Sequence, residues 1–253
     1  MRRATIYPHR SVRSIHLTGV RILMALVVAV GLMTSMYVIR QRLLLEHNRI
    51  STTVLEFFGV PLVKVTNINI FAPLGAAEAA VPDGFHLKND PWRVYILFVC
   101  STLGLLVIHR RVELARNFVV FLIVLILVGT GVMIFSQSFE IGPTEFTQIW
   151  LRQEVLVWLL LPWFSASLFV LMQPAFWSGL LWSLAVEVYA FVWSAVRLAF
   201  CLAVLHYSGL LFVPLLWFGL GMLADVIYIL VFFSLSTHQA AGRAWGRRMS
   251  WQS

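Results

Sequence analysis

The stretch that decides the fold runs from Gly179 to Leu205 and reads GLLWSLAVEVYAFVWSAVRLAFCLAVL. Its only charged residues are Glu187 and Arg197. The stretch is longer than the about 20 helical residues that cross the roughly 30 Å hydrocarbon core of a bilayer. A second apolar run, Leu210–Leu235, follows after a short turn. The two runs are therefore predicted to form a tight antiparallel pair of membrane helices.

The composition of the whole chain agrees with a lipid environment. Hydrophobic residues make up 60% of the 253 residues and charged residues 12%, and the mean hydropathy is +0.86. Soluble domains are about 45–50% apolar and about 25% charged, so a soluble globular protein is excluded. The net charge of +8 is attributed to membrane orientation and not to nucleic-acid binding, because the basic residues gather beside the apolar runs.

Four further apolar runs have a length suited to crossing a bilayer. The fold class is therefore predicted to be all-α, a polytopic membrane protein with about six transmembrane helices. The first run is too long for the core of a signal peptide and lacks a cleavage site of small residues, so it is predicted to remain as an anchor. The four runs are Val20–Ile39, Trp92–Ile108, Phe118–Phe135 and Val155–Met172.

The distribution of Lys and Arg predicts the orientation. With the N-terminus inside, the inner segments hold eleven basic residues and one acid, and the outer segments hold seven basic and eight acidic residues. Because positive charge is retained on the cytoplasmic side, both the basic N-terminal segment 1–19 and the basic tail 236–253 are predicted to be cytoplasmic. A bacterial inner membrane is the expected location.

The segment 40–91 is the one sizeable region outside the apolar runs, and it is predicted to form a small outer cap between the first two membrane helices. Leu43–Phe58 is amphipathic and is expected to continue the first helix outward or to lie on the membrane surface. Val63–Ile70 alternates in the manner of a strand. Pro73–Pro91 is rich in Ala and Gly and is expected to be a loop.

The polar residues inside the last two runs are the first candidates for a site, because an intramembrane charge needs a partner or water. The helical rise of about 1.5 Å places Glu187 and Asp225 within roughly 3 Å of one depth and Arg197 further out. The two carboxyl groups could share a proton or a cation, or they could be separate structural contacts. Arg197 could reach the interface, Asp225 or an acid of a partner subunit. Tyr228 shares a helix face with Asp225 and could donate a hydrogen bond.

The basic residues at the predicted inner ends of the helices are candidates for contact with anionic lipid headgroups. No metal site or cofactor is expected, because the histidines lack neighbouring ligands at metal-binding spacing and no phosphate-binding or hydrolase motif occurs. The candidate headgroup ligands are Arg110, Arg111, Arg243, Arg247 and Arg248.

Two short stretches, Glu56–Pro61 and Trp193–Arg197, are similar to parts of the exosortase-like membrane transpeptidases. The resemblance implies a thiol nucleophile in the outer leaflet with arginines on later helices. The family places Cys-Ser-Gly before the arginine, where this chain has Trp193 at the cysteine position, and its Asn-x-x-Arg box would correspond to Asp225–Tyr228. Cys100 is the remaining candidate nucleophile, although no arginine is predicted to accompany it.

Two classes of function therefore stay open. The first is a non-catalytic integral subunit of an inner-membrane assembly, of the envelope-biogenesis, secretion or conjugation type, with the lipid bilayer and other membrane subunits as partners. The second is a small membrane protein with its own chemistry. This would be an exosortase-like thiol enzyme that uses Cys100, or an ion-coupled carrier that uses Glu187 and Asp225.

Overall fold

The computed structural model describes residues 18–71, 75–83, 91–108, 120, 123–124, 126–128, 130–131, 142–173, 175–208, 212–213 and 216–249. The chain is mostly helical with one pair of strands among these residues. The elements are α1 Gly19–Phe57, β1 Leu62–Phe71, β2 Gly75–Pro82, α2 Pro91–Ile108, α4 Pro143–Ser165, the π-helix η1 Ala166–Val170, α5 Phe176–Ser208, the π-helix η3 Leu216–Leu223 and α7 Ala224–Met249.

Four helical segments are long and apolar enough to cross a membrane, and they indicate a membrane protein. A shorter apolar helical stretch, Tyr95–Gly104, lies in α2. The predicted run Phe118–Phe135 falls largely outside the described residues. The four long segments are Gly19–Phe57, Pro143–Val170, Phe176–Ser208 and Gly219–Gln239.

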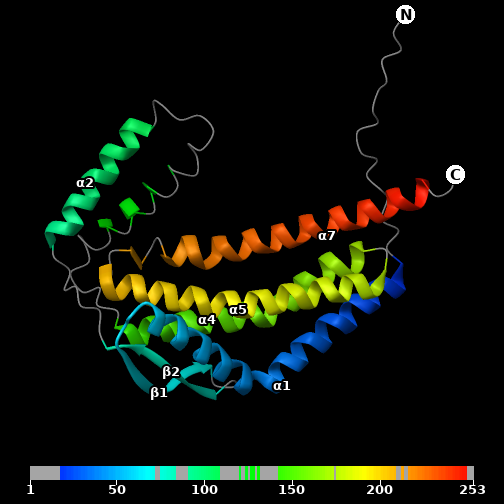
Figure 1. The fold of residues 1–253 in the computed structure, drawn as a ribbon, viewed down its shortest axis with the longest axis horizontal. Coiled ribbons are helices and arrows are strands. Elements are labelled where there is room, and N and C mark those ends of the chain that lie inside the picture. The colour runs from blue at the N-terminus through cyan, green and yellow to red at the C-terminus, as the bar shows by residue number, and fades with distance from the viewer. Residues whose placement is uncertain are drawn as a thin grey trace, which may run out of the picture.

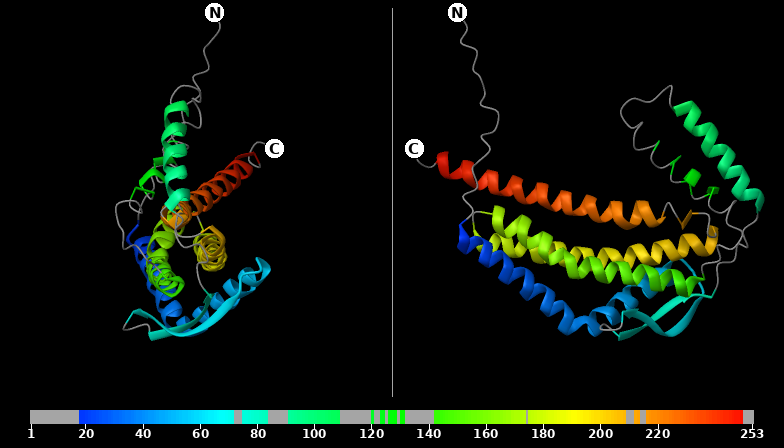
Figure 2. Two further views of the ribbon diagram at one scale, coloured as in Figure 1. Left: turned by 90° about the vertical axis from the view of Figure 1, so that its left-hand side faces the viewer. Right: turned by 180° about the vertical axis from the view of Figure 1, so that it is seen from behind.

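The helices α1, α4, α5 and α7 lie side by side as a bundle (Figure 1). The first residues of α1 and the last residues of α7 lie at one end of this bundle, and the strands β1 and β2 lie at the other, which we call the strand end (Figures 1 and 2). In all three views α2 stands apart from the bundle. The four bundle helices therefore form the common core in which the polar residues of α4, α5 and α7 can meet.

Helix α1 is much longer than the predicted run Val20–Ile39. Its 39 residues correspond to about 58 Å of helix, almost twice the thickness of the hydrocarbon core. Of the two alternatives for Leu43–Phe58, the structure has the continuation of the first helix, which ends at Phe57. The helix ends where Gly59 adopts a φ of +69°, a backbone conformation that glycine reaches without strain. The chain then enters the strand pair.

The strands β1 and β2 pair in an antiparallel register, with Val63 opposite Val81. The strand prediction for Val63–Ile70 is confirmed, whereas the loop prediction for Pro73–Pro91 is wrong over Gly75–Pro82. The all-α expectation therefore misses a hairpin. An Ala- and Gly-rich segment has little strand preference of its own, and here it is held as a strand by hydrogen bonds to the backbone of β1.

The hairpin packs on the bundle. A buried apolar cluster joins Ile68 of β1 and Ala79 of β2 to Leu55 of α1, Phe146 of α4 and Leu202 of α5. The side-chain oxygen Oδ1 of Asn48 in α1 accepts a hydrogen bond from the backbone N–H of Ala80 at 2.9 Å. The hairpin is thus attached to the strand end through both apolar and polar contacts.

Two of the bundle segments contain irregular helix. The π-helix η1 directly follows Ser165, and η3 contains Gly221 with a ψ of −105°, outside the helical range. Close packing accompanies the first irregularity, because a Cβ atom added to Gly179 would lie 2.7 Å from Cα of Val170. Irregular backbone inside a membrane helix is tolerated where protein surrounds it. Both irregularities border buried polar side chains.

Candidate functional site

The guanidinium of Arg197 is the centre of a buried group of charges. Nη1 of Arg197 lies 2.8 Å from Oδ1 of Asp225, and Nη2 forms an ion pair with Oε1 of Glu154. The three side chains come from α5, α7 and α4, and all three residues are buried. Arginine suits this position because its fork of donors contacts two carboxylates at once. We call Glu154, Arg197 and Asp225 the ion cluster.

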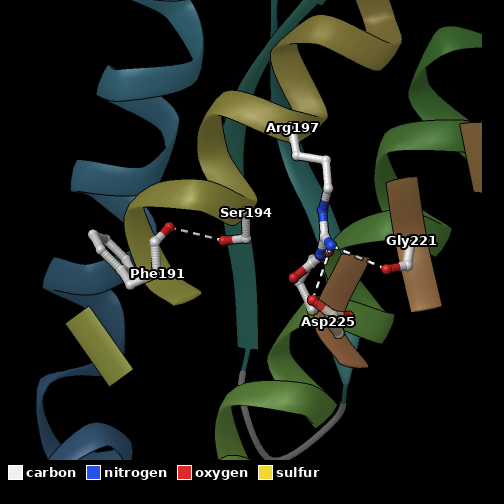
Figure 3. A network of polar contacts seen from close by, with 6 residues as sticks. Phe191, Ser194, Arg197, Gly221 and Asp225 are labelled. Atoms are coloured by element: carbon white, nitrogen blue, oxygen red, sulfur yellow. Dashed lines mark hydrogen bonds and ion pairs between the residues drawn. The ribbon is translucent and has the colours of Figure 1, made fainter. Parts of the chain in front are cut away.

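The irregular backbone of η3 contributes to the ion cluster. Nη1 of Arg197 also donates a hydrogen bond to the carbonyl oxygen of Gly221, at 3.0 Å. Figure 3 shows Arg197 reaching from α5 toward Gly221 and Asp225, which lie one turn apart along the chain. The departure from helical geometry at Gly221 interrupts regular hydrogen bonding in that turn. Arg197 supplies a hydrogen-bond donor to the carbonyl oxygen of Gly221 in place of a helical one.

An aromatic ring covers one side of the guanidinium. The Cζ atom of Arg197 lies 5.6 Å from the ring centroid of Trp150, within the range of a cation–π contact. Trp150 in turn lies against Trp217 of η3, at 5.4 Å between ring centroids. The cluster is therefore flanked by aromatic side chains of α4 and η3.

The charges of the ion cluster do not balance. Two carboxylates face one guanidinium, so the fully ionised cluster would carry a net charge of −1. An uncompensated charge is expensive in a buried apolar environment. The cluster can therefore hold one proton or cation in addition to the arginine.

Glu187 forms a second buried polar level, closer to the end of the bundle opposite the hairpin. Its Oε1 accepts a hydrogen bond from the hydroxyl of Ser165 at 3.2 Å. Its Oε2 and the hydroxyl of Tyr228 are buried without a hydrogen-bond partner among the described residues. We call Ser165, Glu187 and Tyr228 the Glu187 site.

These contacts distinguish between the alternatives that the sequence leaves open. Arg197 contacts Asp225, which was one of its three predicted options. Glu187 and Asp225 have different hydrogen-bond partners, Ser165 and Arg197. The spacing predicts that Tyr228 approaches Asp225, and the two side chains do interact, although the Tyr228 hydroxyl has no partner of regular hydrogen-bond geometry among the described residues.

Glu154 is the cluster residue that the sequence analysis missed. The prediction assigned it to an outer segment, because the apolar run was taken to begin at Val155. In the structure α4 begins at Pro143, and Glu154 lies more than two turns inside the helix. A usable signal was present: Trp150, Glu154 and Trp158 are spaced by four residues, which places them on one helix face, and all three are buried.

His47 is buried in α1 without being part of either polar level. Its ring lies 5.3 Å from the ring of Trp158 and 6.1 Å from that of Phe191, measured between centroids. One turn later, the hydroxyl of Ser51 donates a hydrogen bond to the carbonyl oxygen of Ala195 at 3.0 Å. These contacts attach α1 to α4 and α5 and are best explained as packing.

The other candidate residues are distributed as follows. Cys100 is an exposed free thiol on α2, and Cys201 is a buried one on α5. Arg110 and Arg111 lie outside the described residues. Arg243, Arg247 and Arg248 belong to α7, although only their backbone is described. The described residues include no group of His, Cys, Asp and Glu side chains suited to a metal ion.

Comparisons of the chain with protein-family models, with curated proteins and with solved structures find no match. The features of the chain that bear on its function are therefore the two buried polar levels and the helices around them.

Proposed function

We propose that the chain is a non-catalytic integral subunit of an inner-membrane assembly of the envelope-biogenesis, secretion or conjugation type. The observation that supports this most is the ion cluster. Its three charged side chains are directed at one another and at the Gly221 carbonyl, and they connect α4, α5 and α7. Charges used in this way stabilise a particular arrangement of helices.

In this proposal the chain crosses the membrane about six times with both termini in the cytoplasm, and the hairpin is an outer cap. The arrangement of the bundle supports this orientation. The start of α1 and the end of α7, which the basic segments 1–19 and 236–253 adjoin, share one end of the bundle, and the hairpin lies at the other (Figure 2). An excess of positive charge at one end is the pattern expected of a cytoplasmic side.

Cysteine accessibility tests the orientation. In a chain carrying Cys100→Ala and Cys201→Ala, single cysteines are introduced as Ala80→Cys in β2 and Trp245→Cys near the end of α7. A membrane-impermeant thiol reagent added outside intact cells should label position 80 only, and position 245 should react only after the membrane is opened. The reverse labelling pattern would refute the proposed topology.

The subunit role is tested by the mass of the particle that contains the chain. The chain is tagged at its natural expression level and extracted with a mild detergent, and the particle mass is measured by light scattering. We expect a particle that contains other membrane proteins in fixed ratio to the 28.8 kDa chain. A particle made of this chain and detergent alone would refute the proposed role.

A further inference from the structure

We propose that the Glu187 site is a proton-binding site inside the bundle, separate from the ion cluster, in which Glu187 is a neutral carboxylic acid and a water molecule bridges its Oε2 to Tyr228. The proposal goes beyond the subunit role, because it assigns a ligand to residues that this role leaves unused. It depends on burial, on unsatisfied polar atoms and on the positions of the surrounding charges.

Burial is the first observation. Glu187 is 4% exposed and Tyr228 is 5% exposed. Oε2 of Glu187 and the hydroxyl oxygen of Tyr228 are buried without partners among the described residues. Most buried polar atoms in proteins have a partner, and internal water molecules bind many of those that lack one in the protein.

The surrounding charges are the second observation. Arg197, also on α5, is engaged by Glu154 of α4 and Asp225 of α7. It lies ten residues along α5 from Glu187, which corresponds to about 15 Å of helix. The side chain described as contacting Glu187 is the neutral Ser165. A buried carboxylate with one hydroxyl donor and no nearby cation is strongly disfavoured relative to the neutral acid.

The titratable groups near Tyr228 belong to both polar levels. Tyr228 lies within electrostatic range of Asp225, Arg197, Glu154 and Glu187, whereas the described polar contact of Glu187 itself is the one with Ser165. The ring of Tyr189 on α5 lies tilted against that of Tyr228, with 5.4 Å between the ring centroids, and adds no positive charge. A neutral carboxyl group is both a donor and an acceptor. It can therefore accept from Ser165 and donate to the proposed water.

The irregular helix beside Ser165 is the third observation. The π-helix η1 begins at Ala166, immediately after the residue that donates to Glu187. Single turns of π-helix inside longer helices occur frequently at functional sites. Intramembrane carboxyl groups that bind protons are the common element of proton relays and ion-coupled membrane proteins. The Glu187 site combines both features.

Infrared difference spectroscopy tests the proposal directly. Spectra of the full-length protein at neutral pH are recorded for the wild type and for Glu187→Gln, and one is subtracted from the other. The difference should contain the C=O stretch of a protonated carboxylic acid, and this band should shift in D2O. The matched control is Glu46→Gln, which alters an exposed carboxylate of α1 and should leave the band unchanged.

Two further variants keep the test decisive if Glu187→Gln does not fold. Ser165→Ala removes the hydrogen bond to Oε1, and Tyr228→Phe removes the buried hydroxyl that the proposed water would bridge to Oε2. Each should move the carboxylic-acid band of the otherwise unchanged protein. A difference spectrum without a carboxylic-acid band refutes the proposal, because Glu187 would then be ionised, as in a cation site. A band that neither Ser165→Ala nor Tyr228→Phe moves refutes it as well.

Discussion

Asp225 and Glu187 are buried carboxyl groups on neighbouring helices of one bundle, and the partners of their carboxyl oxygens differ. Asp225 lies beside a guanidinium and forms an ion pair at 2.8 Å. Glu187 accepts a hydrogen bond from a serine, and its second oxygen has no partner among the described residues. The difference shows that the position of a single cation, Arg197, divides the polar core into a charged level and a neutral one.

The geometry of α5 explains why one arginine cannot serve both levels. Arg197 and Glu187 are ten residues apart on the same helix, roughly 15 Å along its axis, which exceeds the reach of the side chain. Arg197 instead bridges sideways to α4 and α7. Substitutions at these residues and in the helices around them test this division.

Replacing the cation should have the largest effect. Arg197→Met preserves much of the apolar length of the side chain and leaves Glu154 and Asp225 buried without their partner. Removing one member of a buried ion pair typically costs about 3–5 kcal/mol. We expect a loss of this size in the free energy of unfolding, measured by titration with a denaturing detergent and followed by tryptophan fluorescence.

The control for this variant is Arg49→Gln on α1. Arg49 forms an exposed contact with Glu46 at 3.9 Å, and exposed pairs of this kind contribute at most about 1 kcal/mol. Equal losses for Arg197→Met and Arg49→Gln would show that the ion cluster does not stabilise the bundle.

The packing of α5 against η1 should be sensitive to added volume at Gly179. A methyl group at Gly179 would lie 2.7 Å from Cα of Val170 and 2.8 Å from the carbonyl oxygen of Phe169. Because these are backbone atoms, Gly179→Ala requires a helix to move, and such overpacking costs about 1–3 kcal/mol. Gly31→Ala is the matched control, because no heavy atom lies within 4 Å of its added methyl group. Detergent-unfolding titrations that give the two alanine variants the same stability would contradict the close contact.

A pair of double-mutant cycles separates the two levels. Combining Arg197→Met with Asp225→Asn should give a coupling of about 1–3 kcal/mol, because the residues contact each other. Combining Glu187→Gln with Asp225→Asn should give about 0.5 kcal/mol or less, because the structure gives them different partners. The same unfolding titration measures both couplings. A larger coupling for the second pair would place the two carboxyl groups in one site.

The smallest effect is expected outside the bundle. Cys100 is exposed on α2, so Cys100→Ala should change the free energy of unfolding by no more than about 0.5 kcal/mol and should leave cellular function intact. The control is Cys201→Ser, which puts a hydroxyl into a fully buried apolar position and should cost about 1–3 kcal/mol. Loss of function in Cys100→Ala at normal expression would support the thiol-enzyme alternative instead.

The sequence predicted the helical membrane character and two of the three cluster residues, because apolar length and isolated charges are local properties. Arg197 and Asp225 stand out in apolar runs, whereas Glu154 follows Arg152 and Gln153 and resembles the end of a polar loop. The strand β2 was missed because its conformation depends on β1. The π-helices η1 and η3 depend on contacts with other helices, such as that of Arg197 with Gly221, and hydropathy does not report such contacts.

The hydrogen bond from Ser51 to Ala195 has a consequence for the synthesis of the protein. The two residues are separated by 144 positions, and a ribosome adds roughly 5–20 residues per second. The inner face of α1, with His47 and Ser51, therefore exists for roughly 7 to 30 s before α5 has been made. During that interval α1 lacks the contact with α5 that buries Ser51 in the folded chain. This part of the bundle can therefore form only late in synthesis.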